Sequence, residues 1–267
     1  MIKNILVPIG ASPDSFHTLQ YAVDFAAEFS AKIYVMEVFN VSVGAGKSLA
    51  NVEQKVVKSS KEHVKEVIEK VDSKNVKIKI ATYNGDIVDG LKDIDKELGI
   101  DLIIMAPRSN DVKEELYLGY TSGRIVKRTN IPTLIVPKGT TLMPMKTILT
   151  AFKSGILKRK RILDPLIAIK QKFDAKVNLL MVKTPGYSDD DLKINTALMD
   201  ISSQLTLTEA PSTYLGVLEH LQSQHPDLLC VFRRKRGFFK NLWEKSTIPK
   251  AEFSARIPVL VLSVKKD

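Results

Sequence analysis

The sequence predicts an α/β protein of two tandem domains, each with a five-stranded parallel sheet covered by helices on both faces. Short apolar, β-branched runs alternate with amphipathic helical stretches along the chain, which is typical of parallel strands joined by helices. Asp101–Ile104 is followed thirty residues later by Ile131–Val136, and Asp227–Cys230 is followed thirty residues later by Ile257–Leu262. The second pair lies 126 residues beyond the first, which indicates a duplicated domain.

The expected strands are short apolar runs bounded by turn residues, and each copy contains five of them. In the first copy they are Asn4–Ile9, Lys32–Phe39, Val76–Tyr83, Asp101–Met105 and Thr133–Val136. In the second they are Thr147–Ala151, Lys176–Met181, Gln204–Thr208, Leu228–Phe232 and Val259–Ser263. Helices are expected at Asp14–Phe29, Ser48–Val71, Gly85–Leu98 and Thr121–Thr129, where apolar residues recur at helical spacing.

The spacing between the copies changes along the chain. The offset between matching residues is 143 for Asn4–Leu6 and 144 for Ala31–Met36. It is 126 for Lys79–Thr82, whose match is Leu205–Thr208. The fall of 18 residues means that the second copy should lack about five turns of the long helix of the first. The domains are predicted at residues 1–140 and 144–267, joined by a short turn-rich connector.

Composition restricts the class of protein. With 267 residues, 44% of them apolar, the chain can fill two cores. Its single cysteine, Cys230, excludes a disulfide framework and should be a small buried side chain. No apolar run approaches the length of a membrane span and no signal segment is visible, so we expect a soluble, cytoplasmic protein. Of the net charge of +10, residues 143–267 carry +9.

Ligands of open parallel sheets bind beyond the carboxyl ends of the strands, where strand order reverses. In the first copy, the turn after strand one and the loop after strand four should line that crevice. The candidate residues are Pro8, Ile9, Gly10, Ala11, Ser12, Val38, Ala106, Ser109, Gly119, Thr121 and Ser122. Gly119 opens a helix whose free N–H groups could take an anion, with the Thr121 and Ser122 hydroxyls as further donors. An ordinary helix cap after a glycine turn would use the same residues.

Three segments carry a family resemblance: Ile5–Pro8, the loop that ends in Gly119, and Ile131–Pro137. They resemble the universal stress protein family, over the whole chain as two tandem copies and more clearly in the first. The resemblance implies flavodoxin-like, adenine-nucleotide α-hydrolase-like domains. It also implies that the last strands, Thr133–Val136 and Val259–Ser263, pair antiparallel and join the two domains as an intramolecular pseudo-dimer, which would cover two open edges.

Many members of that family bind ATP through the pattern G-x-x-G, nine residues, then G-[S/T]. Here the first two glycine positions hold Ala106 and Ser109, and Tyr120 follows Gly119. Gly10 stands where the family usually has an aspartate. Side chains in a phosphate loop block the close approach of the backbone, so the first copy should bind ATP weakly or not at all. ATP is the one cofactor left open, and no metal is expected.

The second copy has basic runs where the nucleotide loops should be. Lys153, Lys158, Arg159, Arg161, Arg233, Arg234 and Arg236 should gather at the carboxyl edge of its sheet. They form either a solvated face or a site for an anion, an acidic protein or a nucleic acid. The neighbouring Phe238, Phe239 and Trp243 fit base stacking or packing on the sheet.

No histidine pair has metal-ligand spacing, and neither a nucleophile elbow nor a Walker lysine is present. We therefore predict a non-enzymatic, stress-associated binding or regulatory protein with a degenerate nucleotide site, leaving slow ATP hydrolysis open. One alternative is an ATP- or AMP-binding switch in the first domain. The other is an anion or nucleic-acid binder in the basic second domain. A homodimer stays open, and no membrane contact is expected.

Overall fold

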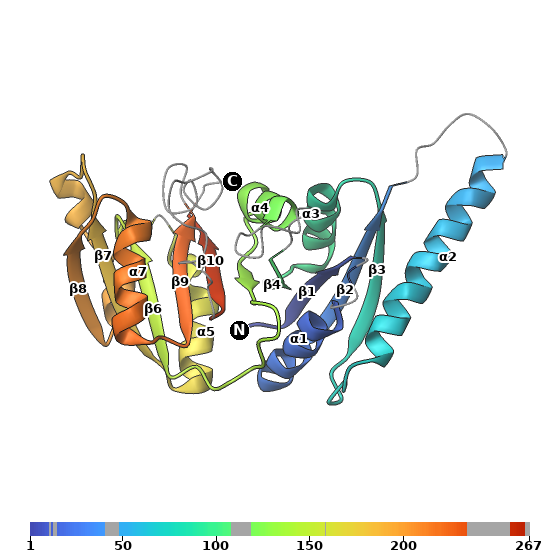
Figure 1. Cartoon of the computed structure of the whole chain (residues 1–267), viewed down its shortest axis with the longest axis horizontal. Coiled ribbons are helices and arrows are strands. Elements are labelled where there is room, and N and C mark those ends of the chain that lie inside the picture. The colour runs from blue at the N-terminus through green and yellow to red at the C-terminus, as the bar shows by residue number, and fades with distance from the viewer. Residues whose placement is uncertain are drawn as a thin grey trace. The chain divides into compact units, whose positions relative to one another are not determined.

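The computed structural model of the chain describes residues 1–10, 12, 15–40, 48–107, 119–157, 159–233 and 257–264. The chain divides into two compact units. The N-terminal unit contains residues 2–105 and 138–142, and the C-terminal unit contains residue 1, residues 106–137 and residues 143–267. Each unit is an α/β structure with a mostly parallel sheet, which confirms the predicted fold class (Figure 1).

The N-terminal unit has four parallel strands in the order β3-β2-β1-β4. The strands are β1 Asn4–Ile9, β2 Lys32–Phe39, β3 Ile78–Asn84 and β4 Leu102–Met105, and the helices are α1 Ser15–Phe29, α2 Ser48–Glu69 and α3 Ile87–Leu98. Its core is apolar and closely packed, because β1 and β4 are buried along almost their whole length and α1 buries Tyr21 and Phe25 against them.

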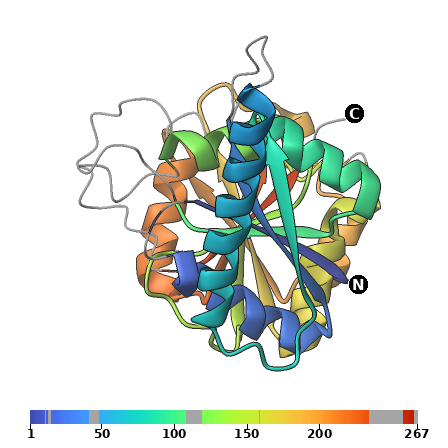
Figure 2. The same cartoon turned by 90° about the vertical axis from the view of Figure 1, so that its right-hand side faces the viewer.

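Helices α2 and α3 cover opposite faces of this sheet. Side chains alternate along β2, so Met36 and Glu37 point to different faces. Glu37 accepts a hydrogen bond from Ser60 of α2, whereas a Cβ on Gly90 of α3 would lie 2.6 Å from Met36 Cε. Figure 2 shows α2 lying across β2 and β3.

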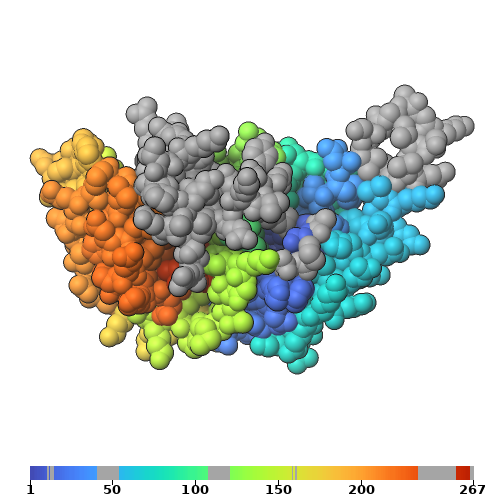
Figure 3. Space-filling model, viewed as in Figure 1, coloured from blue at the N-terminus to red at the C-terminus, as the bar shows by residue number. Residues whose placement is uncertain are grey.

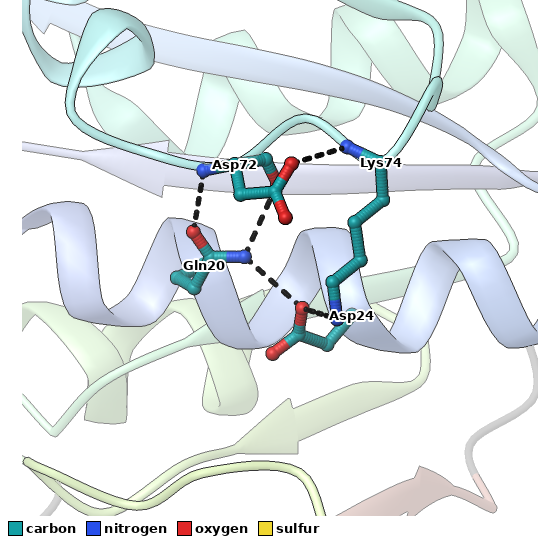
Figure 4. A network of polar contacts seen from close by, with 4 residues as sticks. All are labelled: Gln20, Asp24, Asp72 and Lys74. Carbon is teal, nitrogen blue, oxygen red and sulfur yellow. Dashed lines mark hydrogen bonds and ion pairs between the residues drawn. The ribbon is translucent and has the colours of Figure 1, made fainter.

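The turn between α2 and β3 is fastened to α1 by a polar network (Figure 4). Gln20 exchanges hydrogen bonds with the Asp72 backbone, at 2.8 and 3.2 Å, and Lys74 Nζ lies 2.7 Å from Asp24 Oδ1. The hydrogen bond to Asp24 raises the pKa of the Lys74 ammonium. These contacts hold the turn that precedes β3 against α1.

The C-terminal unit has six strands in the order β5-β10-β9-β6-β7-β8. Its strands are β5 Thr133–Ile135, β6 Thr147–Phe152, β7 Lys176–Lys183, β8 Gln204–Glu209, β9 Leu228–Arg233 and β10 Val259–Ser263. Its helices are α4 Gly119–Arg128, α5 Asp164–Phe173, α6 Thr196–Ile201 and α7 Thr213–Gln224, with 3-10 turns η1 Lys160–Leu163 and η2 Asp189–Leu192.

Strands β5 and β10 pair antiparallel, as the family resemblance implied. Leu260 faces Leu134, with Val259 opposite Ile135 and Val261 opposite Thr133. The last helix and strand of the first copy therefore belong to the same compact unit as the second copy. The boundaries 1–140 and 144–267 describe the sequence repeat and stay a prediction, because the compact units divide the chain differently.

The repeat is visible in its hydrogen bonds. Asp101 Oδ2, just before β4, accepts from the backbone N–H of Lys3 and Asn4 at 2.8 and 2.9 Å. Asp227 Oδ2, just before β9, accepts from Lys146 and Thr147, both at 2.8 Å. In each copy one aspartate thus fixes the start of strand one beside strand four, which is why this residue opens both apolar runs.

One predicted match between the copies is wrong by one residue. Val35 pairs with Ile80 in the N-terminal unit, and Leu179, its counterpart at 144, pairs with Leu205. The third strands are therefore related by 125 residues and not 126. Because side chains alternate, a shift of one residue turns Leu205 and Leu207 to the opposite face from the one that the sequence match implied.

Candidate functional site

The candidate nucleotide-site residues are divided between the two compact units, and those of each unit are described by themselves. In the N-terminal unit, Pro8 and Ile9 are buried at the end of β1, and Gly10 follows them. The Ser15 hydroxyl donates to the Gly10 carbonyl at 2.9 Å, which closes the turn into α1. Ser12 is exposed, and Ala11 lies outside the described residues. The end of β1 itself therefore contributes no carboxylate.

Val38 lies near the carboxyl end of β2, opposite Tyr83 of β3, and is half-buried. By the alternation along β2 it shares the face of Met36, which is the face that α3 covers. The Tyr83 hydroxyl donates to Asp93 of α3 at 3.0 Å, and this bond raises the pKa of the phenol. Val38 therefore offers an apolar side chain, and no polar group, at this end of β2.

In the C-terminal unit, helix α4 begins at Gly119 as predicted, and Thr121 is half-exposed in its first turn. Ser122 is 1% exposed, and its hydroxyl donates to the Ala106 carbonyl at 3.0 Å. A hydroxyl has one hydrogen to donate, so Ser122 is not the free anion donor that we expected. Ser109 and the Tyr120 side chain lie outside the described residues.

Arg233 is the main correction to the predicted basic patch. This last residue of β9 is 6% exposed, and its guanidinium points into the protein. It donates to the carbonyls of Lys127 and Thr129 at 2.8 and 2.9 Å, to Asn130 Oδ1 at 2.8 Å and to the Ser263 hydroxyl. Desolvation by burial lowers the pKa of this guanidinium. The Arg233 guanidinium is therefore directed to oxygens of the protein itself and not to the exposed edge.

The local chemistry explains why an arginine fits there. The last carbonyls of a helix have no partner within it, and the helix dipole makes that end negative. Helix α4 ends at Arg128, so Lys127 and Thr129 present such carbonyls, and the planar guanidinium reaches several oxygens at once. We name Arg233 with Lys127, Thr129, Asn130 and Ser263 the arginine clamp.

The remaining basic residues divide into two groups. Lys153 follows β6, which pairs in parallel with β9, so the two basic runs begin at the same carboxyl edge of the sheet. Arg159 and Arg161 are exposed, and Arg161 Nε lies 3.6 Å from Asp164. Lys158, Arg234 and Arg236, and with them Phe238, Phe239 and Trp243, lie outside the described residues.

A cluster that the sequence reasoning missed holds α2 on the sheet. Glu37 accepts a hydrogen bond from the Ser60 hydroxyl at 2.5 Å, and its other oxygen lies 2.9 Å from His63 Nδ1. The i, i+3 spacing of Ser60 and His63 was the available signal, since it places both on one helix face. Within the described residues, no group of three or more histidine, cysteine or acidic side chains could hold a metal.

Cys230 is fully buried in β9, as predicted, and burial raises the pKa of its thiol. No helix in the described part of the chain combines the length and apolar character needed to cross a membrane.

The model of the universal stress protein family matches residues 1–137, just over half of the 267 residues. The chain therefore belongs to the universal stress protein family. A universal stress protein of Methanocaldococcus jannaschii is 26% identical over 142 residues, which cover 52% of this chain and 84% of that protein.

Solved structures show the same fold over both copies. A universal stress protein from Archaeoglobus fulgidus matches with a TM-score of 0.71 at 17% identity, covering 98% of each chain. A protein of unknown function from Pseudomonas aeruginosa matches with a TM-score of 0.55 at 13% identity, covering 98% of this chain and 93% of its own. The tandem arrangement of two such repeats is thus shared with proteins of similar length.

We expect the arginine clamp to contribute strongly to stability. Arg233→Ala leaves several carbonyl and side-chain oxygens without their donor and should lower the free energy of unfolding by about 2 kcal/mol or more. Arg233→Lys should recover part of this loss, because an ammonium cannot match the planar fork. Urea denaturation measures both. Arg161→Ala, at a side chain that is 94% exposed, is the control and should change stability by less than about 0.5 kcal/mol. Equal effects of the two alanine variants would contradict the clamp.

Proposed function

We propose that the chain is a non-enzymatic binding and regulatory protein of the universal stress type, with a degenerate nucleotide site in its first repeat. The observation that carries the proposal is the internal use of the polar groups that would hold phosphate. Ser122 donates to Ala106, and Gly10 stands where the family usually has an acidic residue. A phosphate ester needs several convergent donors, and among the described candidate residues the Ser122 hydroxyl is directed to a carbonyl of the protein itself.

The chemistry of the described residues also favours a role without catalysis. An enzyme needs a nucleophile, base or metal placed against a substrate. In the cluster of Ser60 and His63 on α2 with Glu37 on β2, both Ser60 and His63 bond to Glu37. The histidine therefore does not accept the serine proton and does not activate the serine as a nucleophile. That cluster holds a helix in place. We therefore regard ATP- or AMP-dependent switching as the alternative that a titration must decide.

We expect MgATP to bind the purified protein with a dissociation constant of about 1 mM or weaker by calorimetry. The double variant Gly10→Asp/Tyr120→Ser, which restores the acidic residue and the hydroxyl of the family pattern, should bind more tightly. Gly119→Trp is the blocked control. Micromolar binding by the wild-type protein that Gly119→Trp abolishes would contradict the proposal and favour the nucleotide switch.

A second candidate function, binding of a polyanion, is favoured by the position of the remaining cations. Lys153, Arg159 and Arg161 lie at or just beyond the carboxyl end of β6, and both arginines are exposed. Several cations at one edge raise the local positive potential and attract a polyanion, with Asp164, 3.6 Å from Arg161 Nε, offsetting part of that charge. We infer that an acidic protein segment or nucleic acid phosphate could neutralise this edge, with Arg233 excluded because it belongs to the clamp.

We expect Arg159→Glu/Arg161→Glu to elute from a heparin column at clearly lower salt than the wild type, because such binding depends on charge. Lys172→Glu/Lys176→Glu makes the same charge change at the amino end of β7, on exposed residues, and should elute later than the first variant. If the two variants elute together, only net charge matters and this edge is a solvated face.

A further inference from the structure

The edge strand β8 has an uncovered apolar face. Leu205 and Leu207 are 41% and 50% exposed, although both lie within a strand of the sheet. They share their face with Leu179 and Met181, their register partners on β7, which are buried. Exposure is thus confined to the edge strand, and the neighbouring strand is covered.

The N-terminal unit shows what covers the equivalent face. There Val35 and Ile80 correspond to Leu179 and Leu205 by strand register, and α2 packs on that face through Ser60, Val64 and Val67. Glu37, which anchors α2, corresponds to Met181. The second repeat has therefore lost both the helix and the carboxylate that held it.

The segment that replaces α2 is too short to cover β8. Between β7 and β8 the chain forms only η2 and the six-residue α6. It buries Leu198 but leaves Leu192 and Met199 exposed at 38% and 42%. Of the seven exposed large apolar side chains among the described residues, four thus fall between residues 192 and 207, which makes this surface distinct. The segment, gold in Figure 3, lies at the surface of the C-terminal unit.

The charge of this surface is opposite to that of the rest of the protein. Residues 184–212 contain one lysine and five acidic residues, a net charge of −4 in a chain of +10. Glu209 follows Leu205 and Leu207 on the same face of β8; its side chain is 81% exposed although one oxygen lies 3.6 Å from Lys183 Nζ, and Asp189 and Asp200 are exposed in η2 and α6. An apolar centre with acidic neighbours complements a segment that is apolar on one side and basic on the other.

We propose that the face of β8 formed by Leu205, Leu207 and Glu209, with the acidic segment before it, is a docking surface for a basic amphipathic helix of a partner protein. The helix occupies the place that α2 occupies in the N-terminal unit. Its leucine-like side chains bury Leu205 and Leu207, and its lysines or arginines face Asp189, Asp200 and Glu209. A second copy of this chain is a poorer occupant, because two chains of +10 repel each other.

The test uses the full chain and a fluorescent peptide of leucine and lysine, about 18 residues long, with leucines at the spacing of one helix face. Fluorescence anisotropy gives the affinity, and hydrogen exchange with mass spectrometry gives the location. We expect the peptide to slow exchange in residues 199–209 and to bind less tightly as salt rises. We expect Leu205→Ser/Leu207→Ser to weaken binding about tenfold or more.

Charge is tested by Asp189→Lys/Asp200→Lys, which spares Asp190, paired with Lys193, and Asp191, which caps η2. This variant should also bind about tenfold more weakly. The controls are Met143→Ser, at a side chain that is 67% exposed, and Glu66→Lys/Glu69→Lys on exposed positions of α2. Both should bind as the wild type does.

Two results would overturn the proposal. If the β8 variants and the controls bind the peptide equally, the face has no preference for such a helix. If light scattering shows a wild-type dimer that Leu205→Ser/Leu207→Ser dissociates, the face is an interface between copies of this chain. Thermal melts of all variants check that they fold, which surface positions should allow.

Discussion

The antiparallel contact between β5 and β10 is the constraint on which the C-terminal unit depends. Elsewhere in the described part of the chain, the strand pairs whose register is known are parallel, so the last strand of each copy would otherwise leave an open edge. Pairing Leu134 with Leu260 removes both edges and carries α4 and β5 into the fold of the second copy. The compact unit and the sequence repeat therefore have different boundaries.

The arginine clamp strengthens the same region at the carboxyl ends of β9 and β10. Arg233 ends β9, Ser263 ends β10, and Lys127 and Thr129 belong to the end of α4, so one side chain joins three elements. A buried guanidinium is tolerable here because oxygens with partial negative charge surround it. The consequence for function is that the basic edge of the second copy has one fewer cation to offer than its sequence suggests.

Much of the fold could be predicted from the sequence, because the residues that fix the strands recur at the same places in both copies. Asp101 and Asp227 lie just before equivalent strands and make equivalent hydrogen bonds, so the spacing between them was enough to predict a duplicated domain. The register of β8 could not be predicted. Its alternating Leu205-Thr206-Leu207-Thr208 fits either face, and only the backbone pairing with Leu179 selects one.

The candidate site was less predictable for a similar reason. Four consecutive cations begin at Arg233, and nothing in their order shows that the first of them turns inward. Ser122 has the expected place at the start of α4, yet its hydroxyl is taken by Ala106, a contact that depends on the path of the chain after β4. Residue type predicted where polar groups would gather, and packing decided which of them remained available.

Hydrogen exchange of individual amides in the native protein tests the joined β5–β10 region most directly. We expect the slow amides of β5 and β10 to exchange with one common opening free energy, and Arg233→Ala to lower it for both strands by the same amount while β1 and β2 are unaffected. Exchange of β5 together with β1 and β2, independently of β10, would contradict the view that the end of the first copy folds as part of the second.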